Sequence, residues 1–387
     1  MSAVTGSPVV SHMTRKSEPD TSRPHSPPEQ RRATVAGTQL FRQRFETTFA
    51  SDFFRLTTFG AVASSIGIGT YLGEPDDGDD AAYESAIALA VRSGINVIDT
   101  AINYRAQRSE RAVGSAIQHA LDDGTVARDA LIVCTKGGYI PLEGAVPSNR
   151  DAYREYVRRE FVEPRILHPD DIVAGGHSLA PRFLKYCIAK SRQNLGLRTI
   201  DVYYLHNPAQ QLVAVSRQDL YKRLRAAMEA MEDAAERGDI GVYGVATWDE
   251  LRSPPESDLH LDLADLVELA ADVGGANHHL RAIQLPINIA MAEAVREPTQ
   301  AVAGRLRPVV EVAPELNLSV FASASMLQGR LTTGLPPALR DVFLHATTDA
   351  QRALAFTRNA PGVTAALVGM RHREHVQENL AEGRPLS

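Results

Sequence analysis

Short apolar runs rich in β-branched residues alternate with longer amphipathic stretches along most of the chain. Eight such runs occur, at residues 61–70, 95–101, 130–136, 200–206, 240–247, 282–288, 318–325 and 364–369. Their nearly continuous hydrophobicity is typical of strands that are covered on both faces, as in a parallel sheet. The pattern therefore predicts eight buried strands.

The stretches between these runs have helical spacing. The clearest spans 219–240, where one face is apolar, the opposite face is charged, and Gly238 supplies a stop. The apolar positions of that face are Leu220, Leu224, Met228 and Met231. Further helices are predicted over 80–93, 109–122, 182–195, 258–273, 348–359 and 373–381. The segment between the sixth and seventh runs is the least regular, because three prolines crowd it.

Strand and helix alternate eight times, which favours an α/β fold of the closed (β/α)8 TIM-barrel type over an open doubly wound sheet. An open dinucleotide-binding sheet would need a G-x-G-x-x-G turn after its first strand. The nearest candidate, "GIGTYLG" at 67–73, lacks that spacing. We expect residues 46–387 to form one barrel domain.

Two segments fall outside the repeating pattern. Residues 1–45 carry few large apolar side chains and much Pro and Ser, so we expect a disordered N-terminal tail; a regulatory or targeting arm is the alternative. A long loop, 137–181, follows the third strand and contains a helix near 151–163. Ordinary βα loops are much shorter, so this one is either a functional wall of the substrate pocket or a mobile surface insertion.

Composition narrows the class of partner. The net charge of −6, with 23% charged and 44% hydrophobic residues, gives no electrostatic case for nucleic acid or an anionic membrane. Small molecules remain as partners, and nothing in the composition specifies an oligomer. The chain has only two cysteines and no apolar run long enough to span a membrane. We therefore expect a cytoplasmic protein.

Ionisable residues stand at the ends of successive predicted strands. The second strand is expected to end at Asp99, with Tyr104 in the next loop; the third is expected to end at Lys136, and the fourth at His206. Taken singly, each has an ordinary interpretation, as a loop cap, a solvated strand end or a core histidine. In a barrel, however, all of these positions meet at one mouth, where the chemistry of this fold takes place.

Together these groups suit the protonation of a carbonyl oxygen. A phenol is a poor acid at neutral pH, and a neighbouring ammonium such as Lys136 favours its ionised form. A carboxylate such as Asp99 holds that ammonium, and a neutral imidazole such as His206 orients the carbonyl. No metal is needed for this chemistry. The sequence thus predicts Tyr104 as a general acid.

Several segments in order resemble one known family. They are "GINVIDTAINY" with "SE" shortly after it, "VCTK", "DVYYLHNP", "GVYGVATW", "QLPIN" and the final "GMRHREHVQEN". This order resembles the aldo-keto reductase superfamily from about residue 55 onward, with most likeness to members that act on sugars or small aldehydes. The resemblance implies a (β/α)8 barrel, the catalytic set Tyr104, Lys136, Asp99 and His206, and NADPH as cofactor, with NADH as the alternative.

The same resemblance implies a set of cofactor-binding residues. The nicotinamide and its ribose would contact Gly69, Thr70, Thr247 and Gln284. The adenosine phosphate and the adenine would contact the last loop and helix, where Arg371 is the natural phosphate partner because its guanidinium can form a bidentate clamp. That group comprises Gly369, Arg371, His375, Glu378 and Asn379.

This sequence also departs from the family pattern. Arg105 follows Tyr104 where a glycine is usual, so we expect bulk and charge beside the proton donor, in the substrate pocket with Asn207 and Trp248. Thr247-Trp248 replaces a Ser-Asn pair, and His375 stands where an arginine is frequent. The aromatic residue that stacks on the nicotinamide is replaced by Ser323 or Ala324.

We therefore expect an NAD(P)H-dependent oxidoreductase that reduces an aldehyde or ketone, or oxidises a sugar or alcohol in reverse. Two other classes remain open. Lys136 could be the Schiff-base nucleophile of a barrel lyase. The altered nicotinamide neighbours are also compatible with a non-catalytic or regulatory barrel that only binds the cofactor.

Overall fold

A closed barrel of eight parallel strands forms the centre of the computed structural model, which describes residues 32–144 and 146–385. The strands follow one another around the barrel in chain order, and the last strand, β12, closes it by pairing with the first, β3. They are β3 (Ile66–Gly69), β4 (Val97–Asp99), β5 (Ile132–Gly137), β6 (Ile200–His206), β7 (Ile240–Ala246), β8 (Leu280–Pro286), β11 (Ser319–Ser323) and β12 (Val363–Gly369). Each overlaps one predicted apolar run to within two residues at the ends that extend beyond it, so the (β/α)8 prediction is confirmed.

The strands are apolar on both faces because each face meets a separate core. On β6, Val202 and Tyr204 point into the barrel, whereas Tyr203 and Leu205 pack against the surrounding helices. All four side chains are fully buried. The alternation of side chains along a strand therefore fills two cores at once, which explains why the sequence shows unbroken hydrophobic runs.

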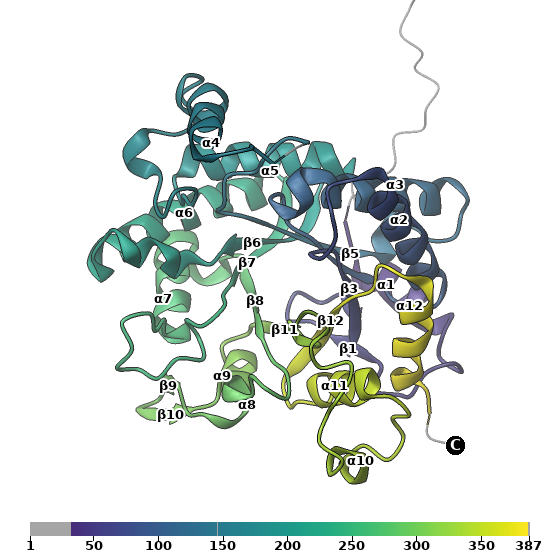
Figure 1. Cartoon of the computed structure of the whole chain (residues 1–387). Coiled ribbons are helices and arrows are strands. Elements are labelled where there is room, and N and C mark those ends of the chain that lie inside the picture. The colour runs from purple at the N-terminus through teal and green to yellow at the C-terminus, as the bar shows by residue number, and fades with distance from the viewer. Residues whose placement is uncertain (1–31, 145, 386–387) are drawn as a thin grey trace, which may run out of the picture.

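Helices surround the barrel (Figure 1). The longer ones are α2 (Asp77–Arg92), α3 (Arg108–Asp122), α5 (Pro181–Leu195), α6 (Arg217–Glu236), α7 (Leu263–Gly274), α11 (Asp349–Arg358) and α12 (Arg373–Leu380). They match the seven predicted helices, and the four apolar positions of α6 are all buried. Within the described part of the chain, none of the helices has the length and apolar character that crossing a membrane requires.

The segment between the sixth and seventh barrel strands is irregular, as the prolines suggest. It contains the short helix α8 (Glu293–Arg296), a hairpin of β9 (Gln300–Val302) and β10 (Arg305–Arg307), and the helix α9 (Val309–Glu315). Pro314 lies inside α9 near its end. Another short helix, α10 (Leu339–Val342), follows β11.

The first apolar run is divided between two structures. Its beginning forms β2 (Val62–Ser64), which pairs with β1 (Phe54–Leu56) in an antiparallel hairpin, and only its end enters the barrel as β3. Ala61 and Ala63 pack with the side chains inside the barrel. The hairpin therefore covers the end of the barrel at which the strands begin, and leaves the opposite end open.

The predicted N-terminal tail is ordered over its last part. Residues 1–31 lie outside the described residues, but α1 (Val35–Gln43) is a capped helix, and Phe41 is 2% exposed. Thr34 caps the helix, and the amide of Val62 donates to Thr38 Oγ1 at 2.9 Å. The expectation of disorder up to residue 45 is therefore wrong for this segment, because its few apolar side chains pack against the barrel instead of solvent.

The long loop after β5 folds over the side of the barrel. It contains α4 (Arg150–Val157), which continues into a wider helical turn over Arg158–Val162, close to the predicted helix at 151–163. The ring of Phe161 packs edge-on against Phe183 of α5, with ring centroids 5.9 Å apart. In Figure 1, α4 projects at the periphery near α5.

Candidate active site

The open end of the barrel leads into a cavity of about 820 Å³. It is lined by residues at the carboxyl ends of the strands, where the sequence placed the candidate site. Most of the predicted residues line it: Gly69, Thr70, Asp99, Tyr104, His206, Asn207, Thr247, Trp248, Gln284, Gly369, Arg371, His375, Glu378 and Asn379. Lys136 lies behind this lining and Arg105 points elsewhere, as described below.

Asp99 and Lys136 form a buried ion pair at the ends of the adjacent strands β4 and β5. Lys136 Nζ donates to Asp99 Oδ2 at 2.7 Å and to the carbonyl of Thr100 at 2.8 Å. The side chains are 8% and 1% exposed. Burial lowers the pKa of Lys136, but the charge of Asp99 and the contacts with Asp99 and Tyr104 together outweigh it, so the pKa is raised. The lysine is therefore a fixed cation.

Tyr104 lies in the loop after β4, with its ring over this cation. Lys136 Nζ is 4.8 Å from the centroid of the ring. Burial raises the pKa of Tyr104 above its ordinary value, and the charge of Lys136 opposes that rise without cancelling it. The cation thus acts in the expected direction, but the net shift is upward because the phenol is buried. Tyr104 is a protonated phenol at neutral pH.

His206, at the end of β6, is a neutral imidazole facing the same cavity. Burial lowers its pKa well below the ordinary value, and the charge of Lys136 adds to this effect. The rings of His206 and Tyr104 have centroids 6.2 Å apart. A neutral imidazole and a protonated phenol therefore stand on the same wall of the cavity.

A second histidine, from the long insertion, supports His206. His177 Nε2 lies 2.8 Å from the carbonyl oxygen of His206, and its Nδ1 lies 2.7 Å from Gln211 Nε2. The backbone carbonyl is an acceptor, so Nε2 carries the proton and Nδ1 accepts from Gln211. Burial lowers the pKa of His177 to about 4. His177 is not predictable from the sequence, because nothing in the 137–181 segment marks it.

Gln284 on β8 completes the contacts of Asp99. Its Nε2 donates to Asp99 Oδ1 at 2.7 Å, so the carboxylate accepts from Gln284 on one oxygen and from Lys136 on the other. The backbone amide of Thr247 donates to the backbone carbonyl of Gln284 at 2.8 Å. Gln284 thus lines the cavity as expected and also holds the ion pair in place.

The last loop and helix form another side of the cavity. Asn379 Oδ1 is buried, and no described residue donates a hydrogen bond to it. Glu378 accepts from Thr348 Oγ1 at 2.6 Å, and Arg371 contacts Asp79. An unsatisfied buried acceptor is costly unless a ligand fills it. Asn379 Oδ1 in a cleft beside Arg371 fits the amino group of a nucleotide base.

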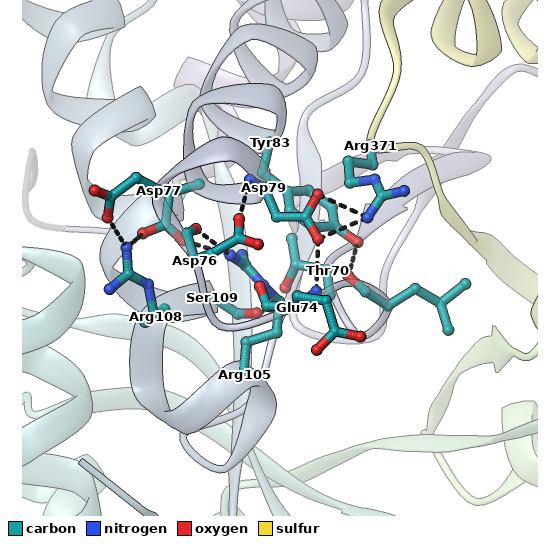
Figure 2. Close-up of polar contacts among 12 residues, drawn as sticks. Thr70, Glu74, Asp76, Asp77, Asp79, Tyr83, Arg105, Arg108, Ser109 and Arg371 are labelled. Atoms are coloured by element: carbon teal, nitrogen blue, oxygen red, sulfur yellow. Dashed lines mark hydrogen bonds and ion pairs between the residues drawn. The ribbon is translucent and has the colours of Figure 1, made fainter. Parts of the chain in front are cut away.

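Arg105 does not line the cavity, so the prediction that it contacts the substrate is wrong. Its Nε donates to the Glu74 carbonyl at 2.8 Å, and its Nη2 donates to Asp80 Oδ1 at 2.5 Å. Figure 2 shows the guanidinium among the residues around the start of α2. The backbone at Arg105 has φ +48 and the next two residues are also left-handed, which turns the side chain away from Tyr104.

The outer part of the cavity is rich in aromatic side chains. Trp248 is 41% exposed at the rim, and Asn207 Nδ2 donates to Tyr139 Oη at 3.0 Å. The ring of Tyr71 lies 5.0 Å from that of Tyr104. Tyr71 was not among the predicted site residues, nor was the contact of Tyr139 with Asn207, although an aromatic residue directly after a strand end was the available signal.

The loop after β11 carries small and flexible side chains toward the cavity. Ser323, Ala324 and Met326 line it, whereas Phe321 is fully buried inside the barrel, 6.4 Å from the ring of Tyr204. The absence of a stacking aromatic at this position, expected from the sequence, therefore holds in the structure. Among the residues described, no group of three or more His, Cys, Asp and Glu side chains is arranged to hold a metal ion.

Comparisons with known proteins find similarity in sequence and in fold. The model of the aldo/keto reductase family matches residues 65–254. A D-threo-aldose 1-dehydrogenase from Pseudomonas sp. is 29% identical over 188 residues, which are 47% of this chain and 50% of that protein. The chain therefore matches only about half the length of this curated relative.

Solved structures extend the likeness of the fold to most of the chain. An aldo/keto reductase from Klebsiella pneumoniae, crystallised with NADP and acetate, superposes with a TM-score of 0.55 at 21% identity. The match covers 86% of this chain and 90% of the other. The holo form of an aldo-keto reductase from Bacillus halodurans gives 0.55 at 17% identity, over 86% and 92%. At this identity the likeness concerns the fold.

Proposed function

We propose that this chain is a member of the aldo/keto reductase family, whose model matches its residues 65–254, and that it is an NAD(P)H-dependent oxidoreductase that reduces an aldehyde or a ketone. The observation that carries the proposal is the buried pair of Asp99 and Lys136 beneath Tyr104. With His206 on the same wall, this set suits a carbonyl oxygen that gains a proton.

In this proposal Tyr104 Oη donates its proton to the carbonyl oxygen. The cation of Lys136 stabilises the phenolate that remains, and Asp99 holds the cation in place. The neutral imidazole of His206 orients the carbonyl oxygen toward Tyr104. The nicotinamide, when bound, supplies the hydride to the carbonyl carbon. In the oxidative direction the same groups work in reverse: the phenolate form of Tyr104, stabilised by Lys136, takes the proton from the alcohol.

We assign cofactor binding to the two sides of the cavity that meet at β3 and β12. Gly69, Thr70, Thr247 and Gln284 lie where the nicotinamide end would contact the barrel. Gly369, Arg371, His375, Glu378 and Asn379 line the adenosine end. The unpaired Asn379 Oδ1 supports this assignment, because the adenine amino group is a suitable donor. NADPH is the proposed cofactor, and NADH is the alternative.

The substrate is proposed to be a small carbonyl compound or a sugar. The relative from Pseudomonas sp. named for aldose oxidation supports this class. A second cavity of about 360 Å³ lies under the long insertion and shares Asn103 and Tyr139 with the main cavity. Asn103 Oδ1 is buried without a partner among the described residues. A polyhydroxylated substrate reaching from the main cavity past Tyr139 would find polar side chains there, those of Asn103 and Gln210.

Lys136 is poorly suited to act as a Schiff-base nucleophile. Such a lysine must be neutral to attack a carbonyl, and its pKa is lowered in enzymes that use it. The pKa of Lys136 is instead raised, its ammonium is paired with Asp99, and its side chain is 1% exposed. These observations favour the reductase over the lyase.

The proposal is tested by titrating the protein with NADPH and NADH and then measuring turnover. Binding is followed by the change in cofactor fluorescence. Consumption of the reduced cofactor is then measured with glyceraldehyde, aldohexoses and aromatic aldehydes, and aldoses are tested with the oxidised cofactor. We expect binding and turnover with at least one class. Binding without turnover would favour a cofactor-binding regulatory barrel, and borohydride trapping of a substrate on Lys136 would favour the lyase.

A cytoplasmic location is part of the proposal. Cys134 and Cys187 are both buried free thiols, which suits a reducing compartment.

A further inference from the structure

Arg371 is already held by a carboxylate at the edge of the cavity. Its Nη1 donates to both oxygens of Asp79, at 2.7 Å to Oδ1 and 2.6 Å to Oδ2. Arg371 follows β12, whereas Asp79 lies in the first turn of α2, so the pair joins the first and last loops of the barrel (Figure 2). The guanidinium of Arg371, which we expected to bind a phosphate, is therefore already paired with the carboxylate of Asp79.

Asp79 is fixed in this position by the chain around it. The amide of Glu74 donates to Asp79 Oδ2 at 2.5 Å. Gly73 has φ +113, and a Cβ at that position would lie 3.1 Å from Arg371 Nη1, so a side chain there would crowd the pair. Burial raises the pKa of Asp79, but the Glu74 amide and Arg371 outweigh it, so the pKa is lowered. Asp79 is a carboxylate at neutral pH.

The remaining nitrogens of Arg371 are open to a ligand. Both bonds to Asp79 come from Nη1, and no residue in the described ranges accepts a hydrogen bond from Nε or Nη2. Arg371 also lines the cavity and is 34% exposed in its side chain. A phosphate bound there would share a single guanidinium charge with Asp79 and would lie close to its carboxylate.

We propose that Asp79 sets the cofactor preference of this protein: by pairing with Arg371, it weakens the binding of the 2′-phosphate of NADP(H) relative to the 2′-hydroxyl of NAD(H). A phosphate carries about −1.5 to −2 charges at neutral pH, so repulsion from Asp79 acts on NADP(H) alone. This inference rests on the proposed function, because it concerns the cofactor of the same cavity.

The test is calorimetric binding of two nucleotide fragments to the full chain, which needs no turnover. The fragments are adenosine 2′,5′-bisphosphate and 5′-AMP, which differ by the 2′-phosphate. We expect Asp79→Asn to raise the affinity for the bisphosphate about tenfold or more, because one neighbouring negative charge is removed. The affinity for 5′-AMP should change less than about twofold, since it has no group beside Asp79.

A matched control lies two residues away. Asp77 is on the same helix turn with its side chain 99% exposed, and it pairs with Arg108 instead of Arg371. Asp77→Asn removes the same charge, and we expect it to leave both affinities unchanged. The double variant Asp79→Asn/Arg371→Gln should not show the higher affinity for the bisphosphate, because that increase depends on the freed guanidinium of Arg371. Asp79→Ser replaces Asp79→Asn as the neutral variant if the latter does not fold.

Each outcome decides the inference. A selective gain for the bisphosphate in Asp79→Asn, absent from Asp77→Asn, supports it. A lower or unchanged affinity overturns it, because Asp79 would then only hold Arg371 in place, and an equal gain in Asp77→Asn overturns it as a general charge effect. These results arise in a protein that binds NADPH or NADH. If the wild type binds neither, the proposed function fails and the inference with it.

Discussion

Arg105, the neighbour of Tyr104, points away from the cavity and forms an ion pair with Asp80 at 2.5 Å. The guanidinium also lies 5.3 Å from the centroid of the Tyr83 ring, and the Arg105 side chain is 1% exposed. Tyr83 Oη in turn donates to the carbonyl of Leu72 at 2.7 Å. Arg105 therefore fastens the loop after β4 to α2, and its role is structural.

Removing this guanidinium should destabilise the protein. We expect Arg105→Met to lower the free energy of unfolding by about 3–5 kcal/mol, because it leaves the partly buried Asp80 without one of its cations. Urea unfolding measures the change. Arg111→Met is the control: its pair with Glu143 is exposed on both sides and should be worth less than about 1 kcal/mol.

The account of Arg105 would be contradicted by the opposite pattern. An Arg105→Met variant with unchanged unfolding free energy but an altered KM for the carbonyl substrate would place the side chain in the substrate pocket.

His177 should make the fold sensitive to acid. Its pKa is about 4 in the fold, against about 6.5 for an unperturbed histidine. A depressed pKa means that the unfolded chain binds the proton more tightly between these values. The contribution of the neutral His177 to the free energy of unfolding is therefore fully present above pH 6.5. It is lost as the pH falls toward 4, by about 3 kcal/mol at the acid end.

The measurement is the free energy of unfolding across this pH range in wild type and His177→Gln. We expect the variant to have a shallower slope, because one buried imidazole no longer has to be protonated on unfolding. The control is the same substitution at the exposed histidine, His345→Gln. Identical slopes in wild type and His177→Gln would show that His177 is not held neutral by burial.

The segment before the barrel should contribute to stability. Phe41 is 2% exposed, with its ring 5.1 Å from that of Phe45, whereas the adjacent Leu40 is 63% exposed. We expect Phe41→Ala to cost about 3–5 kcal/mol and Leu40→Ala less than about 0.5 kcal/mol. Thermal and urea unfolding compare the two. Equal effects would indicate that α1 does not pack on the barrel as described.

The sequence allowed prediction of the barrel and the catalytic wall because both follow from strand periodicity. Buried parallel strands read as continuous apolar runs, and their carboxyl ends meet, so Asp99, Lys136 and His206 could be placed together without coordinates. The orientation of Arg105 could not be predicted, because it depends on a left-handed backbone. Such a backbone is usually indicated by glycine, and this segment has none. His177 could not be predicted either, because its contact with His206 depends on how the insertion folds.

Two further differences come from packing across long sequence separations. The ordered helix α1 has few apolar residues. Its capping residue, Thr34, is hydrogen-bonded to Asp129, almost a hundred residues away in the sequence. The pairing of Arg371 with Asp79 likewise joins the two ends of the barrel sequence. Residue type alone identified Arg371 as a phosphate partner and gave no sign of the competing carboxylate.

Delivery of the proton by Tyr104 can be tested with the variant Tyr104→Phe. This variant keeps the ring over Lys136 and removes only the hydroxyl. We expect NADPH binding, measured by fluorescence titration, to stay within about twofold, and kcat for carbonyl reduction to fall about 10²-fold or more. A Tyr104→Phe protein that binds NADPH and keeps the kcat of the wild type would contradict the account.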